Sequence, residues 1–224
     1  SNLCGALEFS ELVSKSGTQP IIGTQININY KGHIGKIPLF AKNFIGYKNL
    51  ISLSSKSYLE IKENNTPHCE MNDLIQNNEG VIILTGSLDG LVGQLYSKNL
   101  VDEATEILNE LKKVFKDNMY LEIQRHNDKG EKLFENFILE VSKKIDLPLI
   151  ATHEIFYLNK DMHEAHDAYL CVGEKTYVNA SDRRRYSNEH YFKTPDEMHL
   201  LFSDLPEALE NNINFSKRIS YKPE

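Results

Sequence analysis

One stretch decides the fold, residues 148–172 with the sequence PLIATHEIFYLNKDMHEAHDAYLCV, in which an apolar run ends abruptly in polar and titratable residues. The apolar part is short and bounded by Pro148, which is typical of a buried parallel strand covered on both faces. His153 and Glu154 then follow the carboxyl end of that strand. Because the carboxyl ends of parallel strands open to ligand in sheets and barrels, we expect a candidate site there.

Strands and helices alternate from residue 80 onward. The patterns predict strands at 80–87, 119–124 and 147–151 and helices at 100–115, 133–145, 164–172, 195–202 and 206–219. Upstream of these, they predict a helix at 5–16, strands at 20–23, 25–30 and 36–42, a helix from residue 46 and a short helix at 71–76. Such alternation favours a parallel α/β sheet or barrel. The strand ends should bring Ser87, His126 and Glu154 to one rim.

Composition limits the class of protein. With 224 residues, 40% apolar and 25% charged, the chain is typical of one globular domain, and no long uncharged apolar run indicates a membrane span. Three scattered cysteines argue against a disulfide framework and favour a reducing, cytoplasmic setting. A formal charge of -7 argues against a general nucleic-acid clamp.

The rim residues have the side-chain types of a metal site. Imidazoles and carboxylates bind zinc, manganese or iron, and a multi-metal phosphoesterase needs several of them. His126 and Glu154 are plausible ligands, His153 is a weaker one, and Ser87 is a poor one. A histidine at a strand end is more often a hydrogen-bonded rim residue, so we favour that simpler interpretation from the residues alone.

Four motifs carry a family resemblance. They lie at residues 2–9 (NLCGALEF), at 42–50 (KN followed by GYKNL), at 120–126 (YLEIQRH) and at 204–211 (DLPEALEN). Together they resemble the N-terminal PHP domain of bacterial replicative DNA polymerase III alpha subunits. The resemblance implies a distorted barrel of seven strands with helices outside, here incomplete because the first two strands are missing. It also implies that residues 1–224 form a single PHP domain fragment, with the polymerase linker or palm region beginning after about residue 215.

The resemblance also implies which residues occupy the family's metal-ligand positions. Those positions fall on Gln25, Lys36, Ser87, His126, Glu154 and Phe156. Only His126 and Glu154 keep ligand chemistry, and two groups cannot hold a cluster of several metals. The resemblance therefore implies a vestigial site with no catalytic residue and no bound metal, although His126 and Glu154 would be the ligands if one were held.

The function implied is that of a PHP domain in a replicative DNA polymerase. The parent chain would be a nucleotidyltransferase that uses Mg²⁺, whereas this part would have no cofactor and would be a catalytically silent scaffold. Its partners would be the remainder of the alpha chain, the proofreading exonuclease subunit and, through the parent polymerase, DNA, with no membrane. The alternative is a phosphoesterase that depends on Zn²⁺ or Mn²⁺, either a 3′–5′ proofreading exonuclease or a small-molecule phosphatase.

Three structural expectations concern the rim, the arginine cluster and the edge of the sheet. We expect Lys36 to form an ion pair with Glu154, while Phe156 fills volume that a ligand and water occupy in the family. We expect Arg183, Arg184 and Arg185 to lie in an exposed loop that faces the parent polymerase or DNA, because clustered arginines without acids are costly to bury. We expect the strand at 20–23 to leave an open sheet edge.

Overall fold

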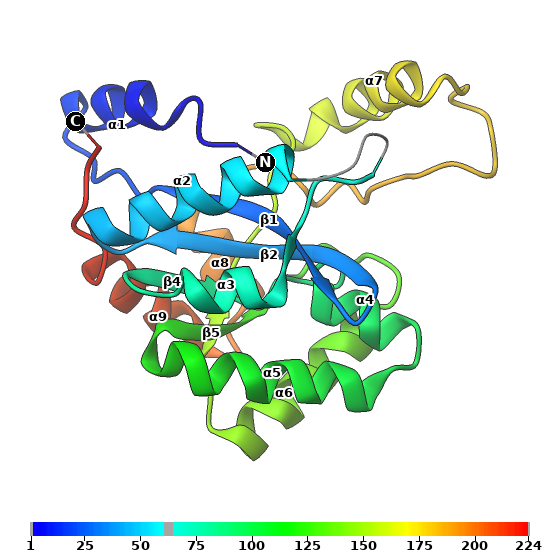
Figure 1. Ribbon diagram of the computed structural model, residues 1–224. Helices are drawn as coiled ribbons and strands as arrows, with labels where there is room; N and C mark the ends of the chain where they lie inside the picture. The colour runs from blue at the N-terminus through cyan, green and yellow to red at the C-terminus, as the bar shows by residue number, and fades with distance from the viewer. Residues whose placement is uncertain (1, 61–64, 224) are drawn as a thin grey trace.

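The structure is a computed structural model, and it describes residues 2–60 and 65–223 (Figure 1). The strands are β1 (Gly23–Tyr30), β2 (His33–Ala41), β3 (Cys69–Glu70), β4 (Val81–Leu84), β5 (Met119–Ile123) and β6 (Leu149–Ala151). The helices are α1 (Ala6–Lys15), α2 (Phe44–Leu59), α3 (Met71–Gln76), α4 (Leu91–Ser97), α5 (Val101–Phe115), α6 (Glu131–Ile145), α7 (His163–Glu174), α8 (Pro195–Leu201) and α9 (Pro206–Lys217), with 3-10 turns at Lys116–Asn118 and Lys160–Met162. The predicted helices are confirmed, and α4 and β3 were not anticipated.

The six strands form one mixed sheet in the order β3-β1-β2-β4-β5-β6. β4, β5 and β6 are parallel, as the alternation predicts, whereas β2 runs antiparallel to both β1 and β4. The mixed α/β class is therefore confirmed. In the described part of the chain the sheet is open, with β3 and β6 at its edges. The expectation that two upstream strands complete a barrel remains a prediction.

The first hairpin differs from the sequence prediction in two places. Lys31 and Gly32, both with positive φ, form the two-residue turn between β1 and β2. The expected separate strand at 20–23 is wrong, because β1 begins only at Gly23 and Pro20 has no N–H to donate to a sheet ladder. On its side away from β2, β1 pairs with β3 only at Ile28 and Asn29.

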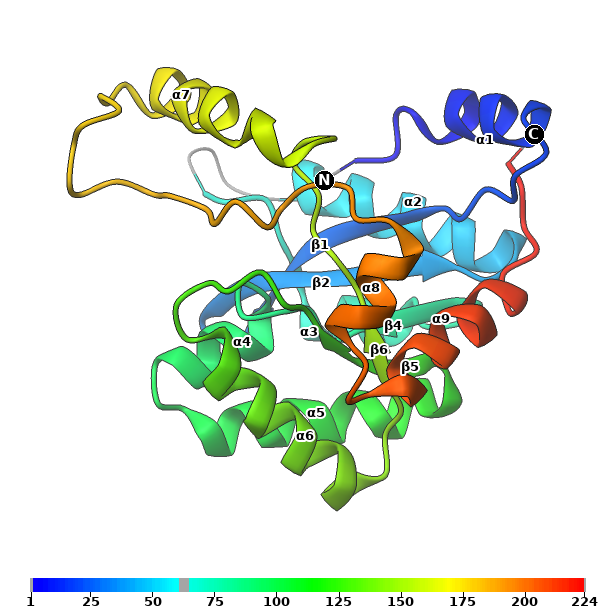
Figure 2. The ribbon, with the colours of Figure 1, turned by 180° about the vertical axis from the view of Figure 1, so that it is seen from behind.

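Two hydrophobic cores cover the two faces of the sheet. Val81 and Ile83 of β4 face the larger core, which α2 to α6 close. Ile82 and Leu84 point the other way, into a smaller cluster with Phe215 of α9. Figure 2 shows α8 and α9 on this second face. Burial on both faces explains why the β4 segment is continuously apolar.

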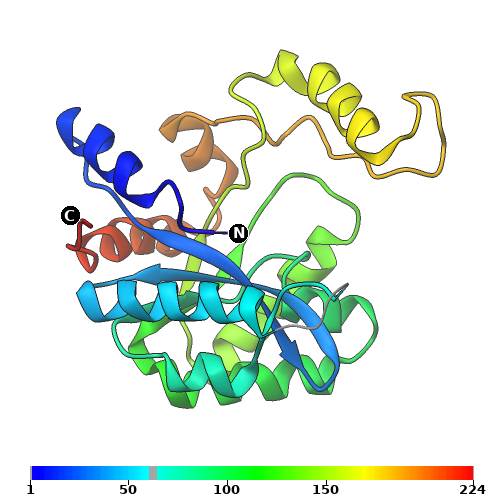
Figure 3. The same cartoon turned by 45° about the horizontal axis from the view of Figure 1, so that its top comes forward.

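A segment between β6 and α8 projects from this body. Figures 1 and 3 show α7 and the chain that follows it standing away from the sheet, and we call residues 158–185 the arm. The chain then returns, and Tyr191 bridges to Tyr157 in parallel. None of the helices in the described ranges is long and apolar enough to cross a membrane.

Candidate functional site

The segments that follow β4, β5 and β6 meet at one rim. Ser87, His126 and Glu154 line a cleft of about 270 Å³ there, together with Arg184 and Arg185 from the end of the arm. The cleft is polar, and its other lining residues include Asp89, Asp128, Lys129, Glu131, Tyr186 and His190. Three residues that are far apart in the sequence therefore lie at one rim, as their positions after parallel strands predict.

A second, smaller pocket adjoins the cleft and holds two more of the expected positions. Gln25 of β1 and Lys36 of β2 line it, and Ser87 and Glu154 line both pockets. Lys36 nevertheless makes no ion pair with any described residue, so the expected pair with Glu154 is wrong. The Lys36 side chain is exposed, and a long flexible side chain reaches water at lower cost than it would pay in a fixed ion pair.

The backbone N–H of His126 and both nitrogens of its ring make polar contacts with the protein. Its backbone N–H donates to the Glu131 carboxylate at 2.7 Å, and its Nδ1 lies 3.1 Å from the other oxygen of that carboxylate. Its Nε2 accepts a hydrogen bond of 3.1 Å from the backbone N–H of Glu154. The Nδ1 atom therefore carries the hydrogen, and the Nε2 lone pair is used by the protein itself.

The faces of the His126 ring are covered as well. His153 stacks on it with ring centroids 4.4 Å apart, and His190 stacks on it at 3.9 Å. The stack continues through Phe156, whose ring centroid is 4.9 Å from that of His190 and 5.2 Å from that of His166. We call these five rings the ring column. Phe156 therefore extends the stack of rings at the rim, and its replacement of a family ligand remains a prediction.

The ring column favours neutral imidazoles at its outer members. Burial lowers the pKa of His153 to about 4, and the neighbouring His126 acts in the same direction. Burial also lowers the pKa of His166, with a further contribution from His163. Neutral rings stack without mutual repulsion, which is consistent with a packed rather than a hydrated rim.

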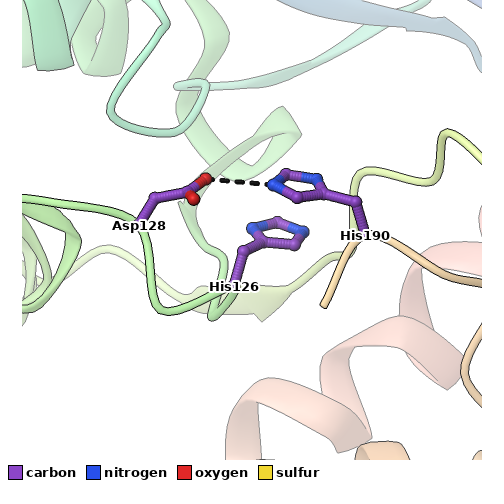
Figure 4. Close-up of side chains that lie close together, drawn as sticks. All are labelled: His126, Asp128 and His190. Atoms are coloured by element: carbon purple, nitrogen blue, oxygen red, sulfur yellow. Dashed lines mark hydrogen bonds and ion pairs between the residues drawn. The ribbon is translucent and has the colours of Figure 1, made fainter. Parts of the chain in front are cut away.

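Three side chains at the rim are of the types that bind metal ions. Atoms of His126, Asp128 and His190 all lie within 4.8 Å of one another (Figure 4). His190 Nε2 is 3.0 Å from the Asp128 carboxylate, and His190 Nδ1 is 3.2 Å from the Glu154 carbonyl oxygen. Both ring nitrogens of His190 therefore contact oxygen atoms of the protein itself.

The arrangement of these rings does not fit a shared metal ion. The planes of His126 and His190 are inclined by only 3°. An imidazole nitrogen binds a metal through a lone pair in its ring plane, and two stacked parallel planes do not meet at one ion. The other positions at which the resemblance implies metal ligands hold Gln25, Lys36, Ser87 and Phe156, and the ammonium of Lys36 would repel a cation.

The three expected contact arginines differ in their surroundings. The Arg183 side chain is only 1% exposed and donates to both carboxylate oxygens of Asp167 at 2.6 Å. The expectation that Arg183 is exposed is therefore wrong, because Asp167 on the inner face of α7 supplies the missing acid. The hydrogen bonds from Arg183 also lower the pKa of Asp167. Arg184 and Arg185 remain exposed, and Arg184 pairs with Glu174 at 3.2 Å.

Sequence reasoning missed Asp128, Glu131 and His190. Asp128 and Glu131 follow His126 closely, so a search of the residues just after the β5 strand would have found them. His190 comes from a loop without periodicity and reaches the rim through hydrogen bonds that no sequence pattern shows. Ser187 contributes one of these bonds, donating to the His126 carbonyl oxygen.

Known proteins resemble this chain over nearly its whole length. Residues 1–126 match the family described as PHP domain. The chain is 37% identical over 97% of its length to the DNA polymerase III subunit alpha of Rickettsia bellii (strain RML369-C), and 35% identical over 99% to that of Caulobacter vibrioides (strain NA1000 / CB15N). It is 33% identical over 97% to that of Vibrio cholerae serotype O1. The matches span 19%, 20% and 19% of these proteins, so the chain covers about a fifth of their length.

Proposed function

Because the chain belongs to the PHP domain family, we propose that it acts as the PHP domain of a DNA polymerase III alpha subunit whose rim no longer hydrolyses phosphate esters. In this proposal the domain is a scaffold for the polymerase core. The curated relatives are alpha subunits about five times as long, which supports a role within a larger polymerase chain. Its partners would be the rest of that chain and the proofreading exonuclease subunit. DNA and the catalytic Mg²⁺ would be bound by the parent polymerase elsewhere.

The state of the His126 ring carries this proposal. His126 and Glu154 are the two family ligand positions that keep ligand chemistry, and the backbone N–H of Glu154 occupies the Nε2 lone pair of His126. The ring stacks cover both faces of the same imidazole. To bind a metal through Nε2, His126 would have to lose this hydrogen bond, and the stacked rings leave it little freedom to turn. A rim packed in this way supports a structural role.

A specific observation favours a second function, a metal-dependent phosphoesterase. His126, Asp128 and His190 are close enough to share one ion if the His190 ring turns out of the stack. A Zn²⁺ or Mn²⁺ ion held there would polarise a phosphate ester beside Arg184 and Arg185, which line the same cleft. The two functions make opposite predictions for metal content and hydrolysis.

The test measures both properties on the purified 224-residue protein. Metal content is determined by mass spectrometry, and release of nucleotide or phosphate is followed with 3′-labelled DNA and p-nitrophenyl phosphate in Zn²⁺ or Mn²⁺. The scaffold proposal predicts metal well below one equivalent and equal, background hydrolysis by wild type and by His126→Ala. Near-stoichiometric metal, with hydrolysis that His126→Ala abolishes, would instead establish the phosphoesterase.

Docking of the exonuclease subunit is tested separately. The purified chain and the exonuclease subunit of the same organism are mixed and run on a size-exclusion column. Co-elution supports docking, and independent elution over the accessible concentration range contradicts it. Rim variants such as His126→Ala serve as the control, because a scaffold should keep its partner when a vestigial side chain is removed.

A further inference from the structure

An apolar groove lies between the last two helices of the chain. It has a volume of about 390 Å³ and runs between α8 and α9, which Figure 2 shows side by side. Its lining residues are Pro195, Met198, His199, Phe202, Ser203, Pro206, Leu209, Glu210, Asn212 and Ile213. Phe202 is fully buried and joins the main core, so the floor of the groove is rigid.

Large apolar side chains beside the groove are exposed to solvent. Ile213 in the wall is 57% exposed, and Leu200 on the outer side of α8 is 78% exposed. The chain after α9 does not cover them, since Tyr221 packs instead against Phe44 and Tyr47 of α2. Exposed apolar surface of this kind around a concave site is typical of a binding site for apolar side chains.

The two helices that form the groove carry exposed acids. The lining of the groove includes no lysine or arginine. Glu210 lines the groove, and Asp196 and Glu207 directly follow its lining residues Pro195 and Pro206 in the sequence. These three acids are exposed, and none of them forms an ion pair with another described residue. The nearby Asp204, in contrast, is paired with Arg125 at 2.6 Å. The unpaired acids would therefore complement a cationic partner.

We propose that this groove binds a basic amphipathic helix of a protein partner. Apolar residues three and four positions apart on such a helix would fill the groove, and flanking lysines or arginines would meet Asp196, Glu207 and Glu210. The proposal concerns a surface remote from the rim, and it stands whether or not the rim binds metal. It adds to the scaffold function a partner defined by its chemistry.

The experiment uses three synthetic peptides of equal length. The first places leucines on one helical face and lysines elsewhere, the second has the same composition in scrambled order, and the third replaces lysine with glutamine. Each carries a fluorophore, and binding to the 224-residue protein is measured by fluorescence anisotropy. The proposal predicts that the first peptide binds at least about tenfold tighter than the others, and that added salt weakens its binding.

Variants locate the binding. Ile213→Asp should weaken binding of the first peptide about tenfold, whereas the matched control Ile51→Asp, at a 42% exposed isoleucine of α2, should leave it unchanged. Glu210→Lys removes an exposed acid without touching the core, so it gives a second test if Ile213→Asp fails to fold.

Several results would overturn the proposal. They are equal binding of the first two peptides, equal effects of Ile213→Asp and Ile51→Asp, or no loss on Glu210→Lys. Tight binding of the glutamine peptide would also reject a cationic partner. Self-association in sedimentation velocity that Ile213→Asp abolishes would assign the groove to a second copy of the chain instead.

Discussion

Arg125 follows β5 directly and joins three parts of the molecule, so its removal tests how the rim is supported. Its Nε and Nη2 donate to the two carboxylate oxygens of Glu135 in α6, at 3.0 and 2.8 Å. The same guanidinium donates to Asp204, between α8 and α9, at 2.6 and 2.9 Å, and lies 4.8 Å from the Phe202 ring centroid. Arg125→Met keeps the volume of the side chain and removes the charge.

The magnitude follows from the exposure of the two acids. Glu135 is only 3% exposed, and leaving one partner of a buried ion pair unpaired costs about 3–5 kcal/mol. Lys132 still reaches Glu135 at 2.9 Å, so the lower end, about 3 kcal/mol, is expected for Arg125→Met. Asp204 is 60% exposed, and the control Asp204→Asn should cost less than about 1 kcal/mol.

The same contacts predict a dependence on pH. Burial alone would raise the pKa of Glu135, but hydrogen bonds from Arg125 and Lys132 lower it below its ordinary value of 4.5. Arg125 likewise lowers the pKa of Asp204 below 3.8. A lowered folded-state pKa adds stability above the unfolded pKa, and that stability is lost as pH falls through the folded value. Wild type should therefore lose stability below about pH 4.5, and Arg125→Met should lose less over the same range.

The assay is urea unfolding followed by circular dichroism, at neutral pH and at acidic pH. Free energies come from linear extrapolation, with equal slopes required for comparison. The double variant Arg125→Met with Glu135→Gln should recover part of the loss, because it removes the unpaired buried charge. If Arg125→Met costs no more than Asp204→Asn, or if its pH dependence matches that of wild type, the account of this network is refuted.

Three further predictions follow from local contacts. Arg183→Ala should lower the midpoint of thermal unfolding, measured by circular dichroism, because it leaves a buried aspartate of α7 unpaired. The control Arg185→Ala should leave the midpoint unchanged. Equal midpoints for the two variants would contradict the buried ion pair. Gly46→Ala should lower the free energy of unfolding in urea by about 1–3 kcal/mol, because its Cβ would lie 1.9 Å from a carbonyl oxygen. Gly173→Ala, in open space on α7, should raise that free energy by about 0.5–1 kcal/mol. Changes of the opposite sign would contradict this account of the packing. Thr194→Ala removes the side-chain cap of α8 and should cost about 1 kcal/mol in the same assay, and no loss would show that the cap does not contribute.

The parts of the fold that the sequence predicts are those with strong periodicity. β4 and β6 are continuous apolar runs because both faces of the sheet are covered, and β5 is interrupted only by Glu122. α5 shows a clear amphipathic pattern. α4 spans only seven residues and β3 only two, which is too short for a period to be visible. β2 begins at His33, earlier than the predicted strand at 36–42, and it includes Gly35, where a Cβ would meet Leu91 of α4.

The site was predictable where it depends on strand ends and was not where it depends on loops. Ser87, His126 and Glu154 follow parallel strands, so topology alone places them at one rim. His190 comes from a loop whose position depends on backbone hydrogen bonds with residues 156 and 157 after β6. The predictions of ion pairs were wrong for a different reason. The Lys36 ammonium can be solvated by water instead of pairing with an acid, and sequence spacing does not show that Arg183 reaches Asp167.

The arm has a consequence for how this domain can change in length. Its two ends are tied together, because the Phe156 N–H donates to the His190 carbonyl oxygen and the Phe192 N–H donates to the Tyr157 carbonyl oxygen, both at 3.0 Å. A loop closed at its base loses entropy only with the logarithm of its length, so doubling the arm would cost about 0.6 kcal/mol. Insertions in the exposed part of the arm, away from Arg183, should therefore leave the rim intact. New sequence could be added there without rebuilding the domain.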